Sequence, residues 1–144
     1  MKRIRVVVAD DHTQLRSLIR ARLEREPDFL VVAEVATGEQ LLDVIPRSRP
    51  DILLIDPALQ GGEGLEVLGA ISRSHPQVKL AVLTAVADTD LRMQLEALGV
   101  HGIFNKGIQS EELVKALRRI GAHGAAHSQQ PSSLKTEENR PCSA

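Results

Sequence analysis

Three aspartates stand at the ends of apolar runs, where their carboxylates could share one cation. Asp10 and Asp11 follow the run at residues 4–9, and Asp56 follows a second run at residues 52–55. Such runs are typical of strands buried in a parallel sheet, and the carboxyl ends of those strands lie at one edge. Carboxylates held close together repel one another, and a hard divalent cation such as Mg²⁺ relieves that repulsion. The sequence therefore predicts an Mg²⁺ site with phosphoryl chemistry at an aspartate.

Two further polar side chains stand where later strand-like runs end. Thr84 follows the run at about 78–83, and Lys106 follows the run at about 100–104. If the strands are parallel, both side chains lie at the same edge as the aspartates. We expect Lys106 to neutralise phosphate charge as a point cation and Thr84 to donate its hydroxyl to a phosphoryl oxygen.

The aspartates are predicted to divide the chemistry between a nucleophile and a metal site. Asp56 stands alone at its strand end with a loop beyond it, so its carboxylate is the predicted nucleophile that carries a phosphoryl group as an acyl phosphate. Asp11, with Asp10 behind it or acting through water, is predicted to hold Mg²⁺ between that nucleophile and the phosphate. One or two carboxylates with water and phosphate are sufficient for Mg²⁺.

Apolar periodicity predicts five strands that alternate with five helices. Four of the helical patterns end at or before Pro27, Pro46, Gly99 and Gly121, which are common helix breakers. Alternating strands and helices predict an α/β fold with helices on both faces of a parallel sheet. At this size the expected architecture is flavodoxin-like, a doubly wound five-stranded sheet in the order 2-1-3-4-5. The predicted strands cover residues at about 4–9, 30–36, 51–55, 78–83 and 100–104.

Composition and charge limit the remaining possibilities. The 144 residues are enough for one domain, which we place at residues 1–122. Residues 123–144 are rich in Ser, Gln, Pro, Ala and Glu, and we expect a disordered polar tail or truncated linker there. The net charge of −1, without a basic block, argues against non-specific nucleic-acid binding. The single cysteine, Cys142, excludes a disulfide framework, and no membrane span or signal peptide is visible, so a cytoplasmic location is expected.

Four segments resemble the receiver domain of two-component response regulators, namely VVVADDHTQLR, ILLIDPALQGGEGLEVL, AVLTA and GIFNKG. The resemblance covers residues 4 to about 122. The stretch ADDHTQLRSLIRARLEREPD, together with EELVKALRRIGAHGA, is most similar to the nitrate-response (NarL-type) branch. The resemblance implies a phosphoacceptor switch rather than an enzyme, with at most Mg²⁺-dependent self-phosphorylation and self-dephosphorylation.

The resemblance also implies a role for each matching residue. Asp56 is the implied phosphoacceptor, and it also contacts the Mg²⁺ ion. The implied phosphodonor is a phosphohistidine of a histidine kinase or a phosphotransfer protein. Asp10 and Asp11 are the implied acidic pair that binds the metal, and the backbone carbonyl of Ala58 is a further implied metal ligand. Thr84 supplies the implied switch hydroxyl, and Lys106 is implied to contact the phosphate.

Regulators of the NarL type normally add a helix-turn-helix domain that binds DNA. The residues after Ala122 are too few and too polar to form one. We therefore expect a receiver that lacks this output domain, with no direct DNA binding by the chain and no membrane association. Receivers of this type can dimerise through their first and fifth helices or through the last helix–strand face, so a weak homodimer is expected.

Three residues depart from the family pattern. Pro57 lacks a backbone N–H directly after the phosphoacceptor, Ile103 stands where the family has an aromatic switch residue, and Gly107 replaces a common proline. Pro57 and Ile103 motivate the alternative of a pseudo-receiver, a protein-interaction module that no longer cycles phosphate. A phosphatase of the haloacid-dehalogenase type is disfavoured, because Ala58 stands where its second aspartate belongs. His12 is expected to be a partly exposed residue at a helix start, without a ligand role.

Overall fold

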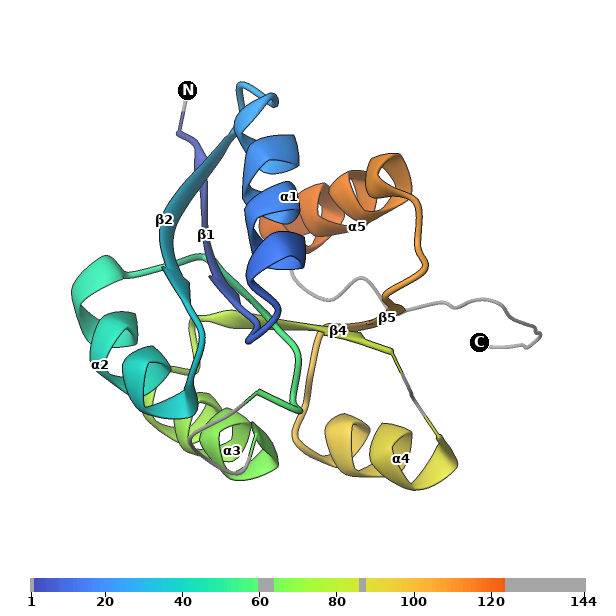
Figure 1. The fold of residues 1–144 in the computed structure, drawn as a ribbon. Helices are drawn as coiled ribbons and strands as arrows, with labels where there is room; N and C mark the ends of the chain where they lie inside the picture. The colour runs from blue at the N-terminus through green and yellow to red at the C-terminus, as the bar shows by residue number, and fades with distance from the viewer. Residues whose placement is uncertain (1, 60–63, 86–87, 124–144) are drawn as a thin grey trace.

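The computed structural model describes residues 2–59, 64–85 and 88–123, in which five strands alternate with five helices (Figure 1). The strands are parallel and form one sheet in the order β2-β1-β3-β4-β5, so the predicted flavodoxin-like fold is confirmed. The strands are β1 (Ile4–Ala9), β2 (Phe29–Val35), β3 (Ile52–Ile55), β4 (Lys79–Thr84) and β5 (Gly102–Asn105). The helices are α1 (Thr13–Glu24), α2 (Gly38–Ser48), α3 (Gly64–Ser74), α4 (Thr89–Ala97) and α5 (Ser110–His123).

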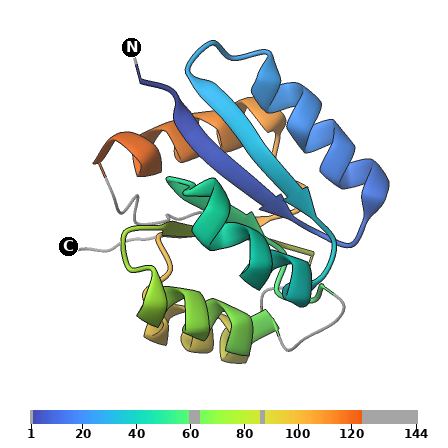
Figure 2. The same ribbon diagram turned by 90° about the vertical axis from the view of Figure 1, so that its left-hand side faces the viewer.

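Alternating side chains of the sheet fill two hydrophobic cores on its opposite faces. Val7 and Ala9 of β1 join the core beneath α2, α3 and α4, whereas Val6 and Val8 join the core beneath α1 and α5. Figures 1 and 2 show these two layers of helices on either side of the sheet. Because strands covered on both faces are apolar along their length, polar groups collect at the strand ends instead.

One helix boundary differs from its predicted position. Pro46 is predicted to end the second helix, but α2 continues through it to Ser48. Proline at this position removes an N–H that would bond to the carbonyl of Leu42. Leu42 is half exposed, so water can satisfy that carbonyl. The helix ends instead at Ser48, and the C-cap residue Arg49 has a left-handed φ of 47° and donates its N–H to the carbonyl of Ile45.

Helix α5 is the last element in the part of the chain that the structure describes. The predicted polar tail at residues 123–144 lies almost wholly outside the described residues and stays a prediction, as does the domain boundary at residue 122. Within the described ranges, none of the helices has both the length and the apolar character needed to cross a membrane.

An arginine of α5 connects three elements beside the first residue of β2. Nε and Nη2 of Arg118 donate to the carboxylate of Asp28 at 2.6 and 3.1 Å, and Nη2 also donates to Glu26 at 2.9 Å. The guanidinium carbon lies 5.6 Å from the centre of the Phe29 ring, within cation–π range. The hydrogen bonds from Arg118 lower the pKa of Asp28, although partial burial acts in the opposite direction.

Replacing Arg118 by glutamine is expected to lower the free energy of unfolding at neutral pH by roughly 1 kcal/mol, a small value because the arginine is partly exposed. A carboxyl group whose pKa is lowered by folding stabilises the protein above its unfolded pKa, and this contribution is lost as the pH falls through the folded pKa. The difference between variant and wild type should therefore shrink below about pH 4, the unfolded pKa of aspartate.

Urea unfolding at several pH values measures this difference. Arg119→Gln is the matched control, because Arg119 is the exposed neighbour on the same helix and should contribute little. An equal loss of stability in the two variants, or a difference that does not change with pH, would contradict this account of Asp28.

Candidate functional site

The carboxyl ends of four strands bring four of the predicted polar residues together beside one cleft. Asp10 follows β1, Asp56 follows β3, Thr84 ends β4 and Lys106 follows β5. Asp10, Asp56 and Thr84 are buried. The cleft has a volume of about 720 Å³, and its lining includes Asp56, Thr84, Lys106 and His12. Parallel strands thus assemble the predicted site from four separate stretches of the sequence.

The ammonium group of Lys106 bridges two carboxylates. Its Nζ lies 2.6 Å from Oδ2 of Asp56 and 3.0 Å from Oδ2 of Asp10. All three side chains are largely shielded from water, so their charges interact strongly. Burial lowers the pKa of Lys106, but its hydrogen bonds to Asp56 and Asp10 outweigh that effect and hold the pKa above its usual value. Lys106 is therefore a permanent cation at neutral pH.

Short turns fix the orientation of both buried carboxylates. Oδ1 of Asp10 accepts a hydrogen bond from the N–H of His12 at 2.8 Å, and Oδ1 of Asp56 accepts one from the N–H of Ala58 at 2.9 Å. Aspartate commonly folds back in this way onto the N–H two residues further on. One oxygen of each carboxylate is engaged by the backbone, so the other oxygen, Oδ2, is directed at Lys106.

Pro57 fits the turn that follows Asp56. The N–H of Leu59 donates to the carbonyl of Asp56 at 3.2 Å and closes a four-residue turn with Pro57 in its second position. Proline is favoured there because its ring already holds φ near the value that the turn needs. The carboxylate of Asp56 bonds to the next N–H, that of Ala58. The proline therefore supports this turn rather than disrupting it.

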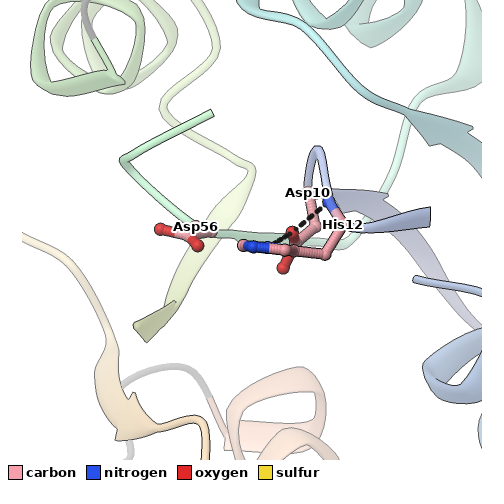
Figure 3. Close-up of side chains that lie close together, drawn as sticks. All are labelled: Asp10, His12 and Asp56. Atoms are coloured by element: carbon pink, nitrogen blue, oxygen red, sulfur yellow. Dashed lines mark hydrogen bonds and ion pairs between the residues drawn. The ribbon is translucent and has the colours of Figure 1, made fainter. Parts of the chain in front are cut away.

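His12 lies closer to the site than its sequence position suggests. Its side chain is 66% exposed at the N-cap of α1, as predicted. Its Nδ1, however, lies 3.0 Å from Oδ1 of Asp10 and 3.2 Å from Nζ of Lys106. Figure 3 shows the imidazole beside Asp10 and facing Asp56. The available signal in the sequence is the spacing of two residues from Asp10, which brings the His12 backbone into the turn described above.

Arg16 is a second residue that the sequence analysis misses. Its Nη1 donates to the backbone carbonyl of Asp10 at 2.6 Å, and its Nε donates to Glu34 of β2 at 3.3 Å. Arg20, one helical turn further along α1, also pairs with Glu34. Arg16 thus holds the loop after β1 against the neighbouring strand. The spacing of four residues from His12, which places both on one side of α1, is the only pattern that points to it.

Two predicted metal ligands are less buried than Asp10 and Asp56. The carboxylate of Asp11 is 22% exposed, and its Oδ1 lies 3.4 Å from Nδ1 of His12. Ala58 is exposed and lines the cleft, and its N–H is directed at Asp56. The metal-binding roles assigned to Asp10, Asp11, Asp56 and Ala58 stay predictions, as do the catalytic roles of Asp56, Thr84 and Lys106.

The donor atoms of the cleft suit Mg²⁺. Asp10 and Asp56 each direct a buried carboxylate oxygen at one positive group, so the ammonium of Lys106 already stands in the place of a cation. Mg²⁺ prefers oxygen ligands and is commonly bound by one or two carboxylates with water and phosphate. The two buried carboxylates and Asp11 therefore supply a sufficient set.

Replacing Lys106 by methionine is expected to raise the affinity for Mg²⁺ by about tenfold, which corresponds to about 1.4 kcal/mol. The reason is that the incoming ion must displace the ammonium from both carboxylates and is repelled by its charge. Isothermal titration with Mg²⁺ measures the change. Lys79→Met is the control, because Lys79 begins β4 at the opposite edge of the sheet and should leave the affinity unchanged. A Lys106 variant that binds Mg²⁺ no more tightly than wild type would show that the ammonium does not compete for the site.

Comparison with known proteins identifies the family. The family model of the response regulator receiver domain matches residues 6–118 of this chain. This chain belongs to the response regulator receiver family. Receiver domains are signalling switches rather than classical enzymes. The response regulator GacA of Pseudomonas aeruginosa is 33% identical to this receiver over 119 residues, which make up 83% of the chain and 56% of GacA. The receiver thus spans about half the length of the curated relatives that it matches.

Solved receiver structures share the fold. The isolated receiver domain of RcsB from Salmonella enterica serovar Typhimurium, determined in the presence of the phosphomimetic BeF₃⁻, has a TM-score of 0.82 and 25% identity, covering 90% of this chain and 95% of that chain. The signal receiver domain of the putative response regulator NarL from Mycobacterium tuberculosis has a TM-score of 0.80 and 27% identity, covering 85% and 99%. The predicted relationship to NarL-type receivers is confirmed.

Proposed function

We propose that this receiver accepts a phosphoryl group on Asp56 and thereby switches a surface that binds a partner. The proposed donor is the phosphohistidine of a histidine kinase or a phosphotransfer protein. The observation that carries the proposal is the bridge of Lys106 between Oδ2 of Asp56 and Oδ2 of Asp10 in an open cleft. A nucleophilic carboxylate beside a fixed cation supplies the positioning and charge stabilisation on which phosphoryl transfer depends.

The transfer forms one bond and breaks one. An oxygen of Asp56 attacks phosphorus while the P–N bond of the phosphohistidine breaks, and the imidazole nitrogen keeps the electron pair and takes up a proton. The N–H of Ala58 holds Oδ1 of Asp56, so we assign the attack to Oδ2, the oxygen that contacts Lys106. The product is an acyl phosphate, and Lys106 offsets its negative charge.

The other cleft residues complete the proposed switch. Asp10, Asp11, Asp56 and the carbonyl of Ala58 would hold Mg²⁺, which neutralises phosphoryl charge when it is bound. Thr84 ends β4 in the same cleft, so its hydroxyl can donate to a phosphoryl oxygen. Movement of Thr84 and Lys106 toward the phosphate would then shift α4, β5 and α5 between two populations.

The partners of the switch follow from the same proposal. We expect the receiver to act in the cytoplasm and to form a weak homodimer. Leu18 of α1 is 67% exposed, and it lines an apolar groove that Ile108 and Leu113 of the α5 region also line. This groove is a suitable surface for such a dimer. Direct DNA binding by this chain is not expected.

A pseudo-receiver is the second candidate function. Ile103 of β5 packs against the core beneath α2, α3 and α4, where an aromatic switch residue is expected in this family. An aliphatic side chain cannot make the same rotation of an aromatic ring when Thr84 moves. This observation favours a module that binds partners without cycling phosphate, although it leaves the acceptor chemistry of Asp56 intact.

Incubation with acetyl phosphate, followed by intact-mass analysis, tests the two candidates. The proposed function predicts one phosphoryl adduct that forms with Mg²⁺ and fails to form with a chelator. No adduct, in a protein that binds Mg²⁺ by titration, would favour the pseudo-receiver. Steady release of phosphate from small phosphoesters would instead indicate a phosphatase.

A further inference from the structure

Nδ1 of His12 lies between groups with opposite requirements. It lies 3.0 Å from Oδ1 of Asp10 and 3.4 Å from Oδ1 of Asp11, which accept hydrogen bonds, and 3.2 Å from Nζ of Lys106, which donates them. In a neutral imidazole, Nδ1 carries either a proton or a lone pair. With the proton it satisfies Asp10 but turns a donor toward the ammonium. With the lone pair it satisfies Lys106 but faces a carboxylate oxygen, so neither tautomer satisfies both kinds of neighbour.

The ammonium of Lys106 marks a point where a cation is already held. Nζ lies 2.6 Å from Asp56, 3.0 Å from Asp10 and 3.2 Å from Nδ1 of His12. Candidate ligand atoms of Asp10, His12 and Asp56 all lie within 4.8 Å of one another (Figure 3). Ligands bonded at roughly 2.0–2.2 Å to one ion lie closer together than this, and small side-chain rotations would close the set.

We propose that Asp10, His12 and Asp56 form a site for a divalent transition-metal ion, with Zn²⁺ as the best fit. The site uses the imidazole nitrogen and is therefore different from the all-oxygen set expected to hold Mg²⁺. Imidazole suits Zn²⁺, whereas Mg²⁺ prefers oxygen ligands. Two carboxylates and one imidazole match an open zinc site, in which three protein ligands leave the fourth position to water.

The bound ion resolves the conflict at His12. It replaces the ammonium of Lys106, and the Nδ1 lone pair and the carboxylate of Asp10 then both face positive charge. The side chain of His12 is 66% exposed, so the ion can reach the site from solvent. Because Asp56 becomes a Zn²⁺ ligand, Zn²⁺ competes with Mg²⁺ and makes Asp56 unavailable as the proposed phosphoacceptor. Binding of Zn²⁺ itself does not depend on phosphoryl transfer, and the site can be tested without any phosphodonor.

Calorimetric titration with Zn²⁺ alone and with Mg²⁺ alone tests the site. The full chain is used with Cys142→Ser, which removes its one thiol. We expect His12→Gln to weaken Zn²⁺ binding by at least about tenfold and to change Mg²⁺ binding by less than about twofold. His75→Gln is the matched control, because His75 follows α3 at the opposite edge of the sheet and should leave Zn²⁺ binding unchanged.

Nitrogen NMR of the imidazole rings identifies the ligand atom. Addition of Zn²⁺ should shift the Nδ1 resonance of His12 far more than its Nε2 resonance. The proposal is overturned if His12→Gln leaves the Zn²⁺ affinity unchanged, if His75→Gln weakens binding equally, or if Nε2 is the nitrogen that responds. Loss of phosphorylation in a separate assay would bear on the proposed function and not on this result.

Discussion

Replacing Asp56 by asparagine is expected to abolish phosphoryl acceptance while leaving the free energy of unfolding within about 1 kcal/mol of wild type. The amide keeps the shape of the carboxylate, and its oxygen can still accept the hydrogen bond from Ala58. It does not attack phosphorus as a carboxylate does, because it carries no negative charge. Losing that charge breaks the pair with Lys106, but it also removes the repulsion between Asp56 and Asp10.

Intact-mass analysis with acetyl phosphate and Mg²⁺ measures the first effect, and urea unfolding measures the second. Asp88→Asn is the matched control. Oδ1 of Asp88 accepts the N–H of Leu91 at the start of α4, and asparagine can form the same cap. This control should be phosphorylated like wild type. A full adduct on the Asp56→Asn variant would show that another carboxylate accepts the phosphoryl group, and the partly exposed Asp11 would be the next candidate.

Replacing Gly64 by alanine is expected to cost about 3 kcal/mol of folding free energy, at the upper end of the range for overpacking. A Cβ on this first residue of α3 would lie 1.7 Å from the carbonyl oxygen of Pro57 and 2.5 Å from its carbonyl carbon. These are backbone atoms, so relief requires a shift of the turn that orients Asp56. We therefore expect weaker Mg²⁺ binding together with the lower stability.

The control lies on the same helix. A Cβ on Gly69 would meet the flexible end of the Arg73 side chain at 3.2 Å and Leu98 at 3.6 Å. Because alanine is favoured over glycine inside a helix by up to about 1 kcal/mol, Gly69→Ala should be neutral or stabilising. Urea unfolding and Mg²⁺ titration of both variants provide the comparison. A Gly64→Ala variant as stable as the Gly69→Ala variant would show that the contact with Pro57 is not tight.

The positions of the strand ends could be predicted because each depends on a local pattern. A strand buried on both faces is an unbroken apolar run, so the first polar residue after it marks the edge of the sheet. Asp10 and Asp56 are such residues, and Lys106 comes one position after the first polar residue of its segment, Asn105. The right-handed parallel topology then brings these strand ends together. The two cores beneath the helices follow from the same alternation along each strand.

The interactions around the site depend on side-chain directions that spacing does not fix. Nothing local to His12 shows that its Nδ1 reaches Lys106, which lies 94 residues further along the chain. The bond from Arg16 to the backbone of Asp10 likewise depends on how α1 packs beside β2. The prediction at Pro46 is wrong because a proline in the last helical turn removes a hydrogen bond that water can replace.

The location of the acyl phosphate tests the central claim most directly. Borohydride reduces an aspartyl phosphate to homoserine, and peptide mass spectrometry of the treated protein then reads the modified position. Asp56, bridged to Asp10 by Lys106, is predicted to be converted in protein incubated with acetyl phosphate and Mg²⁺, and to remain unmodified when Mg²⁺ is chelated. Conversion of Asp10 or Asp11 instead, or of no aspartate in a chain that binds Mg²⁺, would contradict the assignment.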